Sequence, residues 1–323
     1  MDPLLAKAFK GVISIEQNRK WIFKQAAGEA DRSNNRQNRL ETRFRIAEGS
    51  KIFTAVGILL LVEKKRLGLG DTLGRLLPYD LGRVDKTITV RQLLNHTSGV
   101  GEYSEEKDAH KRVSHPISNP WLRAPSDYLP LFIHKPMRFS PGKRFSYSHS
   151  GYILLSLIIE RVMEMPFERF LEQLVFKPAG MENTGYFALD RLPASCATGY
   201  CFDPRLKEFY ANIFSIEAKG AYTTSGDMEA FWQALMEGRL LSKKMLKEML
   251  SPQVAEGFYG YGIWLKDKKD EEFLYFIQGE GPGASFISSY DPQLGRSITL
   301  MSNYGDDALK MHGQIYEKLM RTL

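Results

Sequence analysis

Apolar and polar residues alternate near the start of the chain and again near its end. Residues 11–16 and 21–24 alternate around the polar turn Gln17-Asn18-Arg19, a pattern that predicts a β-hairpin. Residues 50–66 are apolar almost all round, and a helix without a polar face is a buried helix. Further strands are expected at 258–265, 273–277, 285–290 and 297–301, before an amphipathic helix over 307–323.

The middle of the chain has a helical pattern instead. Residues 100–140 hold five prolines together with several aromatic side chains, so we expect an ordered connection with short helices, too apolar for a flexible spacer. Longer helices are predicted over 151–163, 167–175, 227–236 and 242–250.

This order of elements predicts an α+β fold. The simplest packing places the late strands beside the early hairpin in one antiparallel sheet, with the first and last helices covering it. Residues 1–66 and 251–323 then form a discontinuous α/β domain, and residues 67–250 form a mostly helical domain. We expect the active-site cleft between the two domains.

Composition narrows the class of protein. With 323 residues, 43% hydrophobic and 25% charged, the chain is long enough for two domains, and whole-chain disorder is excluded. A formal net charge of +6 is a mild excess, and we expect no nucleic-acid partner. Two cysteines, Cys196 and Cys201, exclude a disulfide framework. Neither a secretory signal nor a bilayer-spanning apolar run is found, so a cytoplasmic location is expected.

Lys51 is the candidate for acid–base chemistry. It falls in the first turn of the apolar helix, where partial burial and the positive end of the helix dipole both disfavour a charged amine. A neutral lysine can serve as a general base, with its partner three residues earlier on the same helix face. Glu48 occupies that earlier position. The alternative is a lysine that carries its amine out to solvent.

Several segments, in order along the chain, are similar to motifs of one enzyme family. They are Arg45-Ile-Ala-Glu-Gly-Ser-Lys-Ile-Phe-Thr-Ala, Arg91-Gln-Leu-Leu-Asn-His-Thr-Ser-Gly, Pro141-Gly-Lys-Arg-Phe-Ser-Tyr-Ser-His-Ser-Gly-Tyr, Phe176-Lys-Pro-Ala-Gly-Met-Glu-Asn-Thr-Gly, Thr223-Thr-Ser-Gly-Asp-Met and Pro282-Gly-Ala-Ser-Phe. The chain thereby resembles the class C β-lactamases and penicillin-binding-protein-like serine hydrolases. The resemblance implies the β-lactamase/transpeptidase-like fold, in which an antiparallel sheet flanked by helices adjoins a mostly helical domain.

The same resemblance implies roles for individual positions. A serine at position 48 would be the acylated nucleophile, Lys51 would take its proton, and Tyr147 would pass the proton to the leaving group. A third motif, Lys-Thr-Gly or His-x-Gly, would supply a cation for the substrate carboxylate and part of the oxyanion hole. No metal and no organic cofactor are implied. The implied substrates are D-amino-acid peptides, β-lactams or small esters.

The first motif departs from the family at its central position. Glu48 stands where the nucleophilic serine belongs, and a carboxylate there would form an ion pair with Lys51 that keeps the amine protonated. Ser50 points off that helix face and is no obvious substitute. Three explanations fit Glu48: a deliberate change in an active enzyme, natural decay to a non-catalytic protein, or a new chemistry.

The second and third motifs depart as well. His149 replaces the asparagine of the Tyr-x-Asn motif. Gly279 matches the glycine of the third motif, but Ile277 or Gln278 stands where a lysine or histidine belongs. We predict His149, Gln278 and Gly279 as substrate contacts. The missing cation weakens the β-lactam and carboxypeptidase hypotheses relative to an esterase.

Two functional hypotheses follow from the residues and the resemblance. In the first, the chain is a serine-hydrolase scaffold for acyl-enzyme hydrolysis of an amide, β-lactam or ester, impaired because Glu48 occupies the nucleophile position. In the second, the chain is a non-catalytic binding protein that retains the cleft. An esterase that uses another nucleophile is a third possibility. The expected partner in each case is a small molecule or a peptide.

Overall fold

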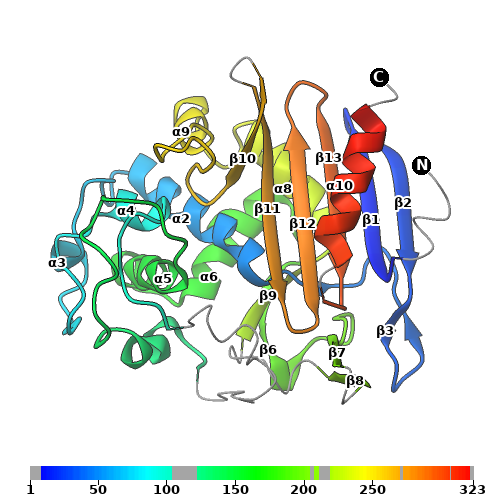
Figure 1. The fold of residues 1–323 in the computed structure, drawn as a ribbon, viewed down its shortest axis with the longest axis horizontal. Helices are drawn as coiled ribbons and strands as arrows, with labels where there is room; N and C mark the ends of the chain where they lie inside the picture. The colour runs from blue at the N-terminus through cyan, green and yellow to red at the C-terminus, as the bar shows by residue number, and fades with distance from the viewer. Residues whose placement is uncertain are drawn as a thin grey trace.

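The computed structural model describes residues 9–103, 122–203, 207–210, 219–269, 272–305 and 307–320. Its largest layer is a six-stranded antiparallel sheet with the strand order β10-β11-β12-β13-β1-β2 (Figure 1). The predicted N-terminal hairpin forms one edge of this sheet, and the late strands lie beside it as expected. The strands are β1 (Gly11–Gln17), β2 (Lys20–Ala27), β10 (Trp264–Lys269), β11 (Glu272–Gly281), β12 (Ala284–Asp291) and β13 (Arg296–Ser302).

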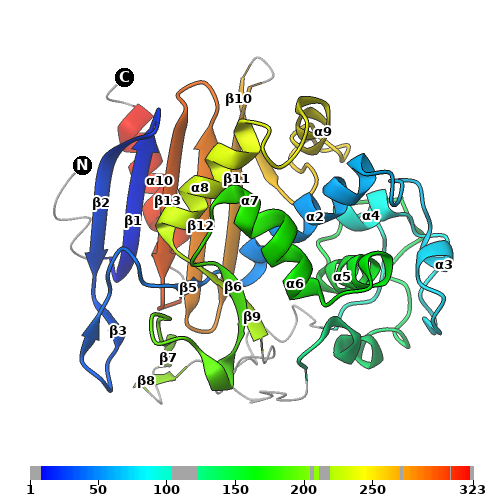
Figure 2. The same cartoon turned by 180° about the vertical axis from the view of Figure 1, so that it is seen from behind.

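Helices cover both faces of this sheet. α10 (Asp307–Met320) packs on one face against β12 and β13, and α8 (Ser225–Met236) packs on the other against β13 and β1 (Figures 1 and 2). β13 is therefore buried along its whole length. Trp232 of α8 is anchored on its face of the sheet, because its indole N–H donates to Ser288 Oγ at 2.8 Å.

α2 (Lys51–Glu63) is the buried helix predicted from the apolar run. Ten of its thirteen residues are buried. It packs chiefly against α5 (His149–Met163), α6 (Phe167–Leu171) and η4 (Glu172–Phe176). The expectation that the first long helix covers the sheet is therefore wrong, because a helix that is apolar on all sides is enclosed by helical neighbours. The amphipathic helix α8 takes that place.

The predicted strand over 258–265 is wrong over most of its length. β10 begins only at Trp264, and the residues before it turn. Gly262 has a φ of +72°, and a Cβ at Gly260 would lie 2.3 Å from Met249 O. Such a backbone cannot continue a regular ladder, although the alternation of aromatic residues predicts one.

A second, three-stranded sheet carries the chain into the helical region, in the order β5-β9-β6. Its strands are β5 (Phe44–Arg45), β9 (Lys219–Thr223) and β6 (Gly185–Ala188). Two short ribbons pair β3 (Glu29–Asp31) with β4 (Arg36–Gln37) and β7 (Tyr200–Asp203) with β8 (Lys207–Tyr210). Further helices of the described residues are η1 (Ala47–Ser50), α3 (Leu73–Leu76), α4 (Val90–Leu94), η3 (Pro125–Leu131), α7 (Lys177–Ala179), η5 (Leu189–Arg191) and α9 (Lys243–Met249).

The helices predicted for the middle of the chain are present as α5, α6 with η4, α8 and α9. η3 is a short helix of the kind expected within 100–140, and residues 104–121 of that range lie outside the described residues. Although α8 falls in the range predicted as helical domain, it packs on the large sheet, so the boundary at residue 250 stays a prediction. Within the described ranges, no helix combines the length and apolar character that crossing a membrane requires.

Candidate active site

The start of α2 is positioned by the strand that precedes it. β5 pairs with β9, and Ile46 N–H donates to Ala221 O at 3.1 Å, which ties the chain to the small sheet just before η1. Ala47 has a φ of +43°, a left-handed conformation that costs a non-glycine residue about 1–2 kcal/mol. Glu48 follows in η1, and Lys51 is the first residue of α2 and 9% exposed. Backbone strain of this kind gathers at functional sites.

The Lys51 amine lies among the side chains to which the matched motifs point. Its Nζ is 3.4 Å from His149 Nδ1. It also lies 4.9 Å from the centroid of the Tyr147 ring and 5.8 Å from that of Tyr152. Aromatic faces at this range stabilise a nearby cation. The fold therefore brings Lys51, Tyr147 and His149 together, although positions 51 and 149 are 98 residues apart.

Tyr147 is held between other rings. Its ring is stacked on Trp264 with 5.8 Å between centroids, and its centroid is 4.3 Å from that of His96. Burial raises the pKa of the Tyr147 phenol well above its usual value, and the charge of Glu48 raises it further. The phenol therefore keeps its proton at neutral pH. The resemblance implies that the Lys51 cation would lower the pKa of this phenol, and in this chain the Glu48 carboxylate acts in the opposite sense.

His96 fixes the backbone next to Tyr147. The ring is fully buried, and its Nδ1 accepts the Ser148 N–H at 3.0 Å. Its Nε2 lies 3.0 Å from Tyr259 Oη. Burial lowers the pKa of His96 well below its usual value, and the charge of Lys51 adds to the effect. The ring is therefore neutral, carries its proton on Nε2 and donates it to Tyr259.

Glu102 caps the helix that carries His149. Its carboxylate accepts hydrogen bonds from the Ser148 hydroxyl, from His149 N–H at 2.9 Å and from Ser150 N–H at 3.3 Å. Glu102 is 8% exposed, and burial raises its pKa while these hydrogen bonds act in the opposite sense. Sequence analysis misses Glu102 and its role, because it lies 46 residues before Ser148 and outside the matched segments.

The Glu48 carboxylate contacts β11. Its Oε2 accepts the backbone N–H of Glu280 at 3.0 Å. This hydrogen bond occupies Oε2, and the ion pair with Lys51 expected from the sequence stays a prediction. The Ser50 hydroxyl donates to Ala47 O at 2.9 Å within its own turn.

Gly279 makes the contact between β11 and η1 possible. A Cβ at this position would lie 2.1 Å from Ile46 O and 2.8 Å from Glu48 N. Side chains alternate between the faces of a strand, so Ile277 shares the face of Gly279 and Gln278 does not. Ile277 is 2% exposed, and an apolar side chain therefore stands two residues before the glycine. The substrate contacts proposed from the sequence for Gln278 and Gly279 stay predictions, as does that of His149.

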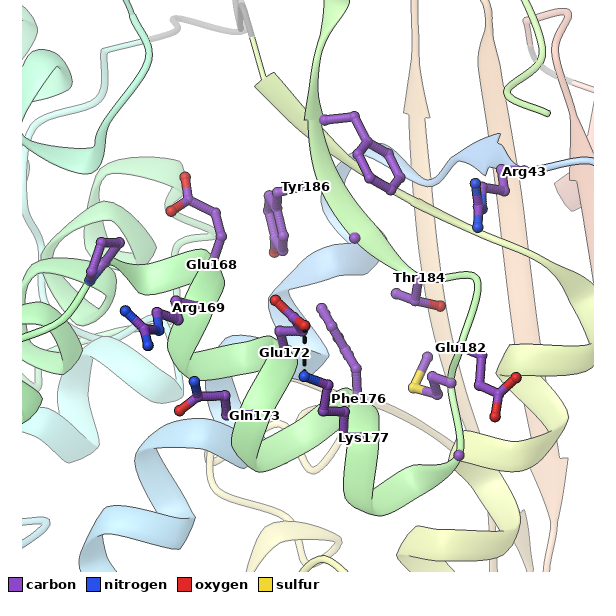
Figure 3. Close-up of a pocket in the computed structure, with 15 residues that line it drawn as sticks. Arg43, Glu168, Arg169, Glu172, Gln173, Phe176, Lys177, Glu182, Thr184 and Tyr186 are labelled. Atoms are coloured by element: carbon purple, nitrogen blue, oxygen red, sulfur yellow. Dashed lines mark ion pairs between the residues drawn. The ribbon is translucent and has the colours of Figure 1, made fainter. Parts of the chain in front are cut away.

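A separate groove of about 980 Å³ lies between α6, η4 and β6 (Figure 3). Figure 3 shows Glu168 and Arg169 on its helical side and Tyr186 on its strand side. Its charges pair locally, since Lys177 Nζ lies 2.9 Å from Glu172 Oε1. The lining residues are Arg43, Pro166, Glu168, Arg169, Glu172, Gln173, Phe176, Lys177, Gly180, Met181, Glu182, Thr184, Gly185, Tyr186 and Phe187. None of them belongs to the cluster around Lys51.

The cysteine positions add no nucleophile to the described site. Cys196 is a buried free thiol, and burial raises its pKa to about 11, so it stays protonated at neutral pH. The side chain of Cys201 lies outside the described residues. In the part of the chain that the structure describes, no group of three or more His, Cys, Asp or Glu side chains is placed to hold a metal ion.

Comparison with known proteins adds the family to this geometry. The family model described as Beta-lactamase matches residues 2–317. The chain belongs to the β-lactamase family. PbpX of Bacillus subtilis (strain 168) is 28% identical over 324 residues, which cover 98% of this chain and 75% of that protein. The crystal structure of a penicillin-binding protein from Bacillus halodurans is 34% identical, with a TM-score of 0.90 over 96% of this chain and 97% of that one.

A more distant structure of this β-lactamase-family fold holds a small ligand. The D-amino acid amidase of Ochrobactrum anthropi SV3, complexed with L-phenylalanine, is 23% identical with a TM-score of 0.78 over 96% of this chain and 94% of that one. At this identity the likeness concerns the fold alone. The α+β, β-lactamase/transpeptidase-like fold expected from the motifs is confirmed, and the chain has the scaffold of a penicillin-binding-protein-like serine hydrolase.

Proposed function

We propose that this chain keeps the substrate cleft of the penicillin-binding-protein-like hydrolases and that Glu48 prevents it from forming an acyl-enzyme. Position 48 is three residues before Lys51, where the family motif has its serine. A carboxylate is a poor acyl acceptor, because attack on an amide or ester would give a mixed anhydride. Loss of a nucleophilic serine removes most of the covalent rate enhancement.

The observation that carries this proposal is the cluster around Lys51. Its amine faces His149 Nδ1 at 3.4 Å and the Tyr147 ring, while the side chain of residue 48 offers no hydroxyl for it to deprotonate. The rest of the acid–base arrangement is thus assembled without a nucleophile. A serine in place of Glu48 would sit on the helix face of Lys51, where the amine could take its proton.

The substrates we propose are small esters and amides without a required carboxylate. Ile277 stands where the family places a cation, so a substrate carboxylate would find no charged partner there. Two solved structures of the D-amino acid amidase hold L-phenylalanine and L-phenylalanine amide, which supports a small amide as ligand. The missing cation supports esters over penicillins.

The runner-up function is a binding protein whose cleft has lost acyl-transfer chemistry altogether. It is supported by the further departures at His149 and Ile277, since a change confined to one residue would have left the second and third motifs intact. The two functions differ in what a serine at position 48 restores.

The test compares this chain with its Glu48→Ser variant. Each protein is incubated with p-nitrophenyl acetate and, separately, with a fluorescent penicillin, and is then examined by intact mass. We expect an ester burst and an acyl adduct on Glu48→Ser alone, with the native protein slower by about 10³-fold or more. Glu48→Ala is the matched control, because it removes the carboxylate without adding a hydroxyl. No adduct on Glu48→Ser would contradict the proposal and leave the binding protein.

A further inference from the structure

At the end of β11, a backbone N–H that would ordinarily pair with a neighbouring strand pairs with a side chain instead. In the described ranges, β10 follows β11 only as far as Trp264 opposite Phe276, so residues 277–281 pair with β12 alone. The N–H of Glu280 in this stretch donates to Glu48 Oε2 at 3.0 Å. A backbone donor at an open sheet edge needs an acceptor from elsewhere. In this chain the acceptor is a carboxylate of the chain itself.

The same stretch of β11 touches the backbone of η1. Because Gly279 has no side chain, Glu48 N comes within 2.8 Å of the point where a Cβ would be. The amides of Glu48 and Glu280 therefore lie next to each other where strand and helix meet. Adjacent amides of this kind are a binding place for an oxyanion or for a polarised carbonyl oxygen.

The Glu48 carboxylate competes with any dissolved ligand for this place. A hydrogen bond from an amide to an ionised carboxylate is stronger than one to a neutral oxygen. Tethering through the side chain also gives the carboxylate a high effective concentration at the amide, on the order of millimolar or above. An external oxygen must displace it before it can bind.

We propose that the Glu48 carboxylate is an internal ligand of the two-amide site formed by Glu48 N and Glu280 N, and that it blocks this site against the oxygen of a substrate. The idea shares its cleft with the proposed function, but it concerns the binding of an oxygen and not the formation of an acyl bond. It adds a second consequence of Glu48: besides removing the nucleophile, the residue fills the position that would stabilise the developing negative charge.

The test measures the binding of phenylphosphonate, a tetrahedral oxyanion, to this chain labelled with ¹⁵N, with the Glu280 amide resonance as reporter. In Glu48→Ala the site is vacated, so we expect phenylphosphonate to bind at least about tenfold more tightly than to the native chain, since a hydrogen bond to a charged group is worth that factor. The Glu280 resonance should move on titration in Glu48→Ala and stay fixed in the native protein.

Glu280→Gln is the matched control. It removes a negative charge from the neighbourhood while leaving Glu48 on the Glu280 amide, so its affinity should rise less than about threefold. Equal gains in Glu48→Ala and Glu280→Gln would overturn the proposal, because the effect would then be general electrostatics. A Glu280 resonance that ignores the ligand in Glu48→Ala would overturn it too.

The phosphonate experiment and the acylation test can contradict their two proposals separately. Phosphonate binding to Glu48→Ala together with no adduct on Glu48→Ser keeps the internal-ligand proposal and contradicts the proposed function. An adduct on Glu48→Ser together with unchanged phosphonate affinity in Glu48→Ala does the reverse. Thermal melting of each variant identifies any that fails to fold. If Glu48→Ala fails to fold, Glu48→Gln replaces it, because glutamine keeps the size of the side chain and one acceptor oxygen. The expected gain in phosphonate affinity is then intermediate.

Discussion

Two carboxylates act on the Lys51–Tyr147 pair, and the chain holds them differently. Glu102, which contacts the N-terminal end of α5, is 8% exposed, and its carboxylate accepts three hydrogen bonds. Glu48, in η1, is half-buried and accepts one amide of β11. Both charges raise the pKa of the Tyr147 phenol. The comparison teaches that Glu102 is part of the structural framework at the start of α5, because its acceptors are matched by donors. Glu48 is not, and its side chain can be replaced without disturbing that framework.

The largest expected effect is on the acylation rate of a Lys51 variant. In a Glu48→Ser background, Lys51→Ala should slow acylation by p-nitrophenyl acetate by about 10³-fold, because the nucleophile loses its general base. Lys64→Ala, at the exposed end of α2, is the control and should leave the rate unchanged. Burst kinetics measure both. Equal rates in the Lys51 and Lys64 variants would show that the amine takes no part.

The next effect tests the two carboxylates directly through stability. Glu102→Ala leaves the Ser148 hydroxyl and the N–H groups of His149 and Ser150 without their acceptor, so the free energy of unfolding should fall by about 3 kcal/mol. Glu48→Ala should lower it by only about 1 kcal/mol, because a single amide at a solvated edge loses its acceptor. Urea unfolding measures both variants. Similar losses of stability in the two variants would contradict the difference drawn between Glu102 and Glu48.

A third carboxylate sharpens the comparison through the pH dependence of stability, with the smallest effect for each step of one pH unit. Glu229 of α8 is 3% exposed, and its Oε1 has no hydrogen-bond partner among the described residues. Burial raises the pKa of Glu229 to about 8, with the neighbouring Glu16 adding to the shift. Burial without enough donors thus favours the protonated acid, whereas Glu102 is compensated by its three donors.

The sign of the resulting pH dependence follows from proton binding. Between its ordinary value of 4.5 and about 8, folded Glu229 keeps a proton that the unfolded chain releases. Its contribution to stability is therefore complete below the lower value and is lost as the pH rises toward the upper one, by about 1 kcal/mol per pH unit. Urea unfolding across this range should show a flatter profile for Glu229→Gln than for the native chain. Parallel profiles would contradict this assignment.

Much of the fold could be predicted because local patterns agree with global packing. The apolar run became α2, and the alternating segments near both ends met in one sheet. The strand expected at 258–265 was wrong because Gly260 and Gly262 bend the chain where the alternation of aromatics continues. The helix over one sheet face was misassigned because periodicity shows that a helix is buried without showing what buries it.

The candidate site was predictable only as far as motifs reach. Lys51, Tyr147 and His149 fall in matched segments, and the fold brings them together. Glu102 could not be found, because a buried cap is defined by donors far along the chain. The contact of Glu48 with the Glu280 amide could not be found, because sequence spacing points to the nearby Lys51 and gives no sign of that amide.

The measurement that tests the central claim most directly is the location of the acyl group after reaction with p-nitrophenyl acetate. Native protein and Glu48→Ser are treated in parallel, digested and mapped by peptide mass. The account predicts an acetyl group on residue 48 of Glu48→Ser and none on the native chain. Acetylation of another residue to the same extent in both proteins, or none at position 48 of Glu48→Ser, would contradict the claim that Glu48 alone separates this cleft from acyl transfer.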